Sequence, residues 1–145
     1  MTRTQKMDPV VRHVEQKEQV ALQAIAYSQN QLETQKQRLQ QLVEYRLDYV
    51  EQQQSGERIY SAVEMQEFQR FLSQLDQTFK QQQKLVELAR REVEFKRENW
   101  LKTRIRSDAL HKVVENMQQQ QRSVENRLEQ KAQDEFSQRL FHHKS

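Results

Sequence analysis

The side chains of this sequence that could bind a metal ion are few and scattered. Its histidines are His13, His111, His142 and His143, of which the last two are neighbours. Two adjacent histidines can ligate a metal ion, but they lie in a terminal segment, and such segments are usually solvated. We favour the solvated interpretation and predict no metal site.

The residues needed for covalent catalysis or phosphate binding are also missing. The sequence has no cysteine, and its single glycine, Gly56, cannot form a glycine-rich phosphate loop. Carboxylates such as Glu92 and Glu94 lie among lysines and arginines, where ion pairing on a helix surface explains them. We therefore expect neither an enzyme nor a cofactor.

A basic segment, RREVEFKRENWLKTRIR at residues 90–106, is the strongest charged feature. Its glutamates precede basic residues by four positions, as in Glu92 and Lys96, which stabilises a solvated helix. That interpretation is favoured, and binding to an acidic protein surface ranks ahead of binding to nucleic acid. A net charge of +3 is small for a dedicated nucleic-acid-binding protein.

The composition indicates long helices rather than a compact core. Hydrophobic residues make up 34% of the chain, against about 45–50% in ordinary globular domains. Mean hydropathy is −1.13, no apolar run reaches the ~18 residues of a membrane span, and no secretory signal is evident. A cytosolic protein is therefore expected. Because glycine and proline are nearly absent, we expect long helices with a narrow apolar seam.

The first helix is predicted over residues 9–53, with Asp8 as its N-cap and Pro9 in its first turn. Its seam positions recur every 3.5 residues, as in a coiled coil. They are Val11, Val14, Glu18, Ala21, Ile25, Ser28, Leu32, Gln35, Leu39, Leu42, Arg46 and Tyr49. The helix is expected to end in a turn over residues 54–60, where Gly56 takes a left-handed conformation.

The second helix is predicted over residues 61–141 and begins with a capping box. Ser61 should accept a hydrogen bond from the Glu64 amide, and the Glu64 side chain should reach back to the Ser61 amide. Its seam positions continue the 3.5-residue spacing. They are Phe68, Leu72, Leu75, Phe79, Gln82, Val86, Ala89, Val93, Lys96, Trp100 and Thr103, followed more weakly by Leu110, Val114, Met117, Val124 and Leu128.

The expected fold is all-α: residues 1–145 form a single antiparallel coiled-coil hairpin with unequal arms. The seams pair best when Gln35 faces Phe79 and Glu18 faces Lys96, although a register shifted by four residues stays open. In this register the second helix outruns the first beyond about residues 100–106. Val114, Met117, Val124 and Leu128 would then be unpaired, and we expect them to bind a partner.

Aromatic residues gather on both sides of the predicted turn. Tyr49 is on the seam, whereas Tyr45 and Phe71 are off it. These rings either close the open end of the coiled coil or form an exposed contact patch, and the sequence favours neither. As a patch, Tyr45 and Phe71 should be exposed, and Leu42, Tyr49 and Leu75 should be more buried beneath them.

The sequence of the predicted helices around this turn resembles the FliJ family of the bacterial flagellar type III export apparatus. The resemblance rests on EQVALQAIAYSQNQLETQKQRLQQLVEYRLDYV, a glycine-containing turn and EMQEFQRFLSQLDQTFKQQ, with KAQDE near the C-terminus. Five residues match the family's positions for binding the export gate: Leu42, Tyr45, Tyr49, Phe71 and Leu75. At Arg38, Thr78 and Gln82 this sequence departs from the residue types of the family.

The resemblance implies a non-catalytic stalk, similar to the two-helix stalk of the rotary ATPase gamma subunit. It would bind the hexameric export ATPase and promote its assembly, contact the export gate protein FlhA and escort export chaperones. Its place would be the cytoplasm, peripheral to the inner membrane at the flagellar base. The alternatives are a stalk protein of virulence type III secretion and a nucleic-acid-binding coiled coil with a basic helix.

Overall fold

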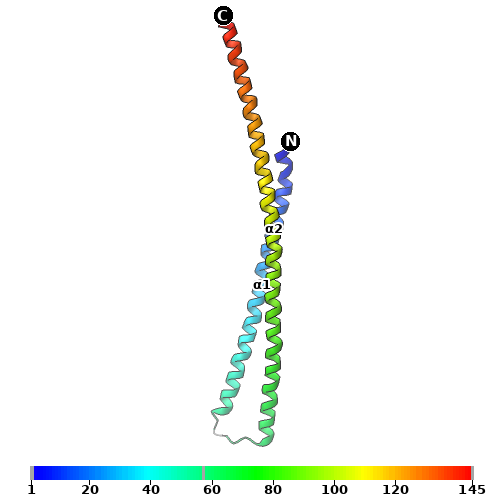
Figure 1. Cartoon of the computed structure of the whole chain (residues 1–145). Coiled ribbons are helices and arrows are strands. Elements are labelled where there is room, and N and C mark those ends of the chain that lie inside the picture. The colour runs from blue at the N-terminus through cyan, green and yellow to red at the C-terminus, as the bar shows by residue number, and fades with distance from the viewer. Residues whose placement is uncertain (1, 57, 145) are drawn as a thin grey trace. The chain divides into compact units, whose positions relative to one another are not determined.

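Two helices form an antiparallel hairpin in the computed structural model, which describes residues 2–56 and 58–144 and, for Lys144, only the backbone (Figure 1). Helix α1 spans Arg3–Gln54 and helix α2 spans Ala62–Lys144, with 52 and 83 residues. The described residues contain no strand. The predicted all-α hairpin with unequal arms is confirmed.

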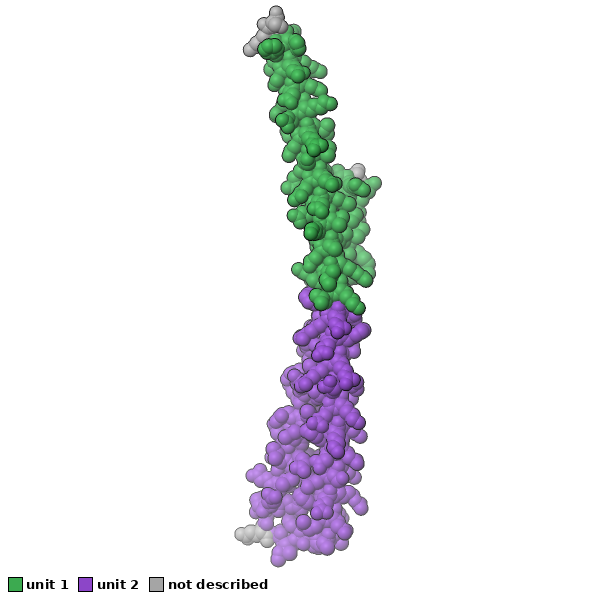
Figure 2. Space-filling view, in the orientation of Figure 1, with its two compact units in different colours: residues 1–19, 101–145 green, residues 20–100 purple. Residues whose placement is uncertain are grey.

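The chain divides into two compact units, and each contains parts of both helices (Figure 2). Unit 2 comprises residues 20–100 and includes the turn. Unit 1 comprises residues 1–19 and 101–145, the start of α1 and the C-terminal part of α2.

Helix α1 starts at Arg3, so the predicted start at Asp8 and Pro9 is wrong. A capping box precedes it: the Gln5 amide donates to Thr2 Oγ1 at 3.3 Å, and the Thr2 amide donates to Gln5 Oε1 at 3.0 Å. These bonds satisfy two amides that a helix start leaves without partners. Pro9 therefore lies inside α1, past its first turn.

The turn does not use its glycine as predicted. Helix α1 ends at Gln54, the Ser55 amide donates to the Glu51 carbonyl at 2.9 Å, and Gly56 has no positive φ. Residues 55–61 connect the helices, and a connection of this length can reverse the chain without a left-handed residue. The expected left-handed Gly56 is wrong.

The start of α2 confirms half of the predicted capping box. The Glu64 amide donates to Ser61 Oγ at 3.2 Å. The Glu64 side chain does not return to the Ser61 amide, because it accepts a hydrogen bond from Arg58 Nη2 at 3.5 Å. The turn segment is thereby connected to the first turn of α2.

In unit 2 the predicted seam faces are buried, but the pairing differs by about one helical turn. Val86, Val93 and Gln82 are buried on α2. Gln82 Nε2 donates to the Gln35 carbonyl at 3.0 Å and to Gln35 Oε1 at 2.7 Å, so Gln35 does not pair with Phe79 as expected. This amide layer pairs Gln35 three residues beyond Phe79, a shift close to the four-residue one that the seams had left open.

In unit 1 the predicted pair of Glu18 with Lys96 is also wrong. Glu18 accepts a hydrogen bond from Arg104 Nη1 at 2.8 Å, while Lys96 pairs with Glu92 of its own helix at 3.5 Å. The hydrogen bond to Glu18 and the charge of Asp108 raise the pKa of the Arg104 guanidinium. A charged seam position is thus paired, as its location requires, but with a different partner.

Candidate protein-binding surfaces

The aromatic residues beside the turn form one connected ring cluster in unit 2. The rings of Tyr49 and Phe68 stack with centroids 5.1 Å apart. The ring centroid of Phe71 lies 4.5 Å from that of Tyr49, with the rings tilted, and 6.1 Å from that of Tyr45, with the rings edge to face. Such ring pairs stabilise one another beyond the area they bury. The ring cluster, Tyr45, Tyr49, Phe68 and Phe71, therefore joins the two helices near the turn.

Exposure separates the members of the predicted patch. Tyr45 is 52% exposed, whereas Leu42, Tyr49 and Leu75 are half-buried as expected. Phe71 is half-buried too, so its predicted exposure is wrong. Its ring contacts both Tyr49 and Tyr45, and this contact covers a residue that lies off the seam.

A shallow groove of about 250 Å³ adjoins this patch. It is lined by Leu42, Val43, Arg46, Leu47, Leu75, Asp76 and Phe79. Leu47 is exposed, and Arg46 pairs with Asp76 at 3.0 Å across the two helices. Leu47 was not among the predicted site residues.

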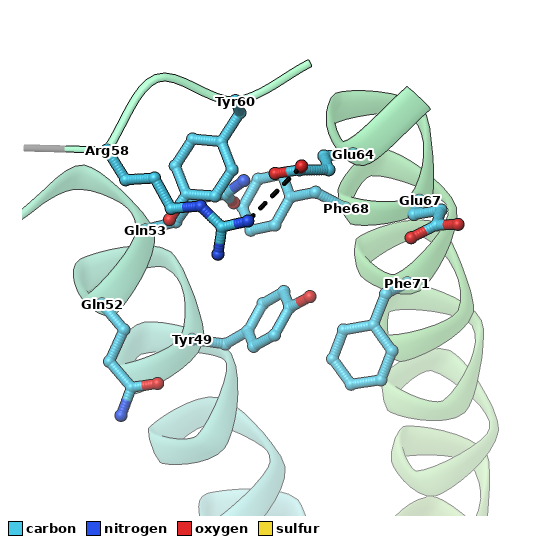
Figure 3. Close-up of a pocket in the computed structure, with 9 residues that line it drawn as sticks. All are labelled: Tyr49, Gln52, Gln53, Arg58, Tyr60, Glu64, Glu67, Phe68 and Phe71. Carbon is cyan, nitrogen blue, oxygen red and sulfur yellow. Dashed lines mark hydrogen bonds and ion pairs between the residues drawn. The ribbon is translucent and has the colours of Figure 1, made fainter. Parts of the chain in front are cut away.

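A larger cleft of about 790 Å³ opens between the helices at the turn (Figure 3). It is lined by Tyr49, Gln52, Gln53, Arg58, Tyr60, Glu64, Glu67, Phe68 and Phe71. Figure 3 shows Arg58 and Tyr60 coming from the turn segment, with Arg58 directed to Glu64 of α2. Heptad spacing does not reach the turn segment, so it gave no signal for Arg58 or Tyr60.

The second predicted site lies on α2 in unit 1, and only part of it lacks α1 as a neighbour. Thr4 Oγ1 donates to Gln121 Oε1 at 3.0 Å, so α1 accompanies α2 well beyond Arg106. Val114 and Met117 are half-buried, and their prediction as unpaired residues is wrong. The cause is the earlier start of α1 together with the shifted register.

The part of α2 beyond Gln121, here called the overhang, comprises residues 122–144. The side chains described in it are all exposed. Val124 and Leu128 are 54% and 63% exposed, as predicted, and Phe136, Leu140 and Phe141 are exposed with them. A single helix with so much exposed apolar surface is the kind of surface that protein partners cover.

Searches for other kinds of site give little within the described residues. No group of three or more histidine, aspartate or glutamate side chains there could hold a metal ion. Nor does any described helix have a stretch apolar and long enough to cross a membrane.

A paired helical seam, a ring cluster at the turn and an exposed helix end define a coiled-coil interaction protein. The family model for the flagellar FliJ protein matches residues 3–145, nearly the whole sequence, and the chain belongs to the FliJ family. Members of this family are non-catalytic components of the flagellar export apparatus. No curated protein and no solved structure matches the chain.

Proposed function

We propose that this chain is a coiled-coil adaptor of flagellar export that binds two partners through different units. The turn surface of unit 2 binds the cytoplasmic domain of the export gate protein FlhA. The overhang of unit 1 binds the hexameric export ATPase and promotes its assembly. The family match supports the export role, and the two exposed surfaces support the division between partners.

The observation that carries the gate proposal is the environment of Tyr45. Half of its surface is exposed, and its ring rests against Phe71, which rests against Tyr49. A ring held by other rings loses little conformational freedom on binding, and tyrosines of this kind often dominate the energy of an interface. Leu42 and Leu75 line the groove that adjoins the ring cluster, and they would extend the surface that the gate covers.

The ATPase proposal rests on the overhang. Val124 and Leu128 are exposed on α2: Val124 lies at the edge of the paired region, beside Thr4 of α1, and Leu128 lies further along the helix. Covering one such side chain contributes roughly 1.5–3 kcal/mol of hydrophobic free energy. A partner that covers both would supply useful affinity without altering the hairpin.

Two further roles complete the proposal. Escort of export chaperones fits a protein with several exposed apolar surfaces, and it is supported by family membership. A cytoplasmic location, peripheral to the inner membrane at the flagellar base, follows from binding the gate and the ATPase.

The proposal is tested by purified components. Calorimetry should show the full chain binding the FlhA cytoplasmic domain, and ATP hydrolysis by the export ATPase should rise when the chain is added. Leu128→Ser should reduce that stimulation, whereas Leu101→Ser is the matched control, since Leu101 is an exposed leucine of α2 in unit 1 outside the overhang. Equal stimulation by both variants would remove the overhang as the ATPase contact.

A further inference from the structure

The cleft at the turn combines aromatic rings with two carboxylates, those of Glu64 and Glu67. Four of its lining residues, Tyr49, Tyr60, Phe68 and Phe71, contribute rings (Figure 3).

The charged side chains that line the cleft carry a net negative charge, which attracts a cation. Among the described residues that line it, the charged ones are Arg58, Glu64 and Glu67. Arg58 is paired with Glu64 at 3.5 Å, whereas no ion pair joins Glu67 to another described side chain. The site therefore keeps one exposed carboxylate available to accept hydrogen bonds.

Aromatic rings and a carboxylate together match an arginine side chain. A guanidinium is planar, carries five N–H donors and stacks on aromatic rings, and it is more weakly hydrated than the ammonium of lysine. At about 790 Å³ the cleft is larger than one side chain needs, so it also admits the neighbouring backbone of the arginine.

The protein already places one guanidinium in this environment. The Arg58 guanidinium lies 5.7 Å from the centre of the Tyr60 ring while it pairs with Glu64. The Arg58 side chain is 71% exposed, and exposed ion pairs are weakly held. Arg58 can therefore leave Glu64 at little cost when another cation arrives.

We propose that the turn cleft is an arginine-binding site for a segment of a protein partner, and that Arg58 occupies part of it in the free protein. The partner's guanidinium stacks on the ring cluster, donates to the Glu67 carboxylate, and replaces Arg58 beside Glu64. The inference rests on the proposed function in one respect, that this end of the hairpin meets a protein.

The test uses the full chain and a small probe, so it does not depend on FlhA. N-acetyl-arginine amide is titrated at millimolar concentrations while NMR follows the ring signals of Tyr49 and Phe68. N-acetyl-citrulline amide has nearly the same shape without the charge and serves as the control ligand. Saturable shifts with arginine and none with citrulline are expected, and equal shifts with the two would overturn the proposal.

Three variants test whether the arginine probe binds in the turn cleft. Glu67→Gln should weaken arginine binding roughly fivefold or more, because a charge-assisted hydrogen bond is lost. Glu94→Gln makes the same charge change at an exposed position of α2 outside the cleft and should leave binding unchanged. Arg58→Gln should strengthen binding by up to roughly fivefold, the range expected for removing an exposed competing ion pair.

Two results would contradict the assignment: an equal loss in Glu67→Gln and Glu94→Gln, or weaker binding in Arg58→Gln. Failure of the chain to bind FlhA would instead count against the proposed function and leave the probe result standing.

Discussion

Gly56 occupies a turn position that would accept a side chain. A Cβ atom there would meet Gln52 O and the Tyr60 hydroxyl at 3.8 Å and Arg58 N at 3.9 Å, which are ordinary contact distances. Its φ is not positive, so an alanine would not be strained. Alanine also reduces the freedom of the unfolded chain, which commonly stabilises a protein by about 0.4–1 kcal/mol.

We therefore predict that Gly56→Ala is neutral or slightly stabilising in thermal unfolding followed by circular dichroism. A marked fall in melting temperature would show that the turn does require glycine.

Glu18 and Glu15 are neighbouring acidic residues of α1 with different surroundings. Glu18 is 13% exposed and bound to Arg104 at 2.8 Å, whereas Glu15 is 53% exposed and lies 3.6 Å from His111. Reversing the charge of Glu18 sets it against Arg104 within a half-buried seam, but the same change at Glu15 is screened by solvent.

Glu18→Lys should therefore lower the midpoint of urea unfolding more than Glu15→Lys does. Combining Glu18→Lys with Arg104→Glu should recover part of the loss. Equal midpoints for the two single variants, or no recovery in the double variant, would contradict the pairing in unit 1.

The length of α1 determines how much of α2 is paired with it. The contact of Thr4 with Gln121 ties the start of α1 to α2, and the side chains described beyond Gln121 are exposed. Ending the chain at Arg127 should remove helical signal in proportion to length and leave the unfolding midpoint nearly unchanged. Ending it at Arg106 should lower the midpoint, because the start of α1 loses its partner. Circular dichroism during urea unfolding distinguishes the two truncations, and equal midpoints would contradict the described pairing.

The helices and their seam faces were predictable because buried residues recur every 3.5 positions. Ser28, Gln82, Val86 and Val93 are all buried where the spacing placed them. The register was not predictable by matching apolar residues, because a buried hydrogen-bonded pair, Gln35 with Gln82, sets it in unit 2. Polar layers of this kind carry little hydrophobic signal but specify alignment.

The ends of the helices were harder to predict than their faces. The dipeptide Asp8-Pro9 is a plausible helix start, yet α1 begins earlier, after the capping box formed by Thr2 and Gln5. The ring cluster was predicted in part: Tyr45 is exposed as expected, but Phe71 is not, since ring contacts rather than heptad phase decide its burial.

The two units of the molecule expose different surfaces. Unit 2 has the ring cluster, the shallow groove and the turn cleft, and unit 1 has the overhang with its exposed Val124 and Leu128. Helix α2 belongs to both units as one continuous element. We expect gate binding and ATPase stimulation to be lost independently when each surface is altered.

The central claim is that the turn surface binds the export gate, and the affinity of Tyr45→Ala for the FlhA cytoplasmic domain tests it most directly. Tyr27→Ala is the matched control, because Tyr27 is a 67% exposed tyrosine of α1 in the same unit without a ring contact among those described. Calorimetry should show at least a tenfold loss for Tyr45→Ala, about 1.4 kcal/mol, with a melting temperature close to that of the parent. Tyr27→Ala should bind as the parent does. Unchanged affinity for Tyr45→Ala would contradict the claim and leave the ring cluster only the role of joining the helices beside the turn.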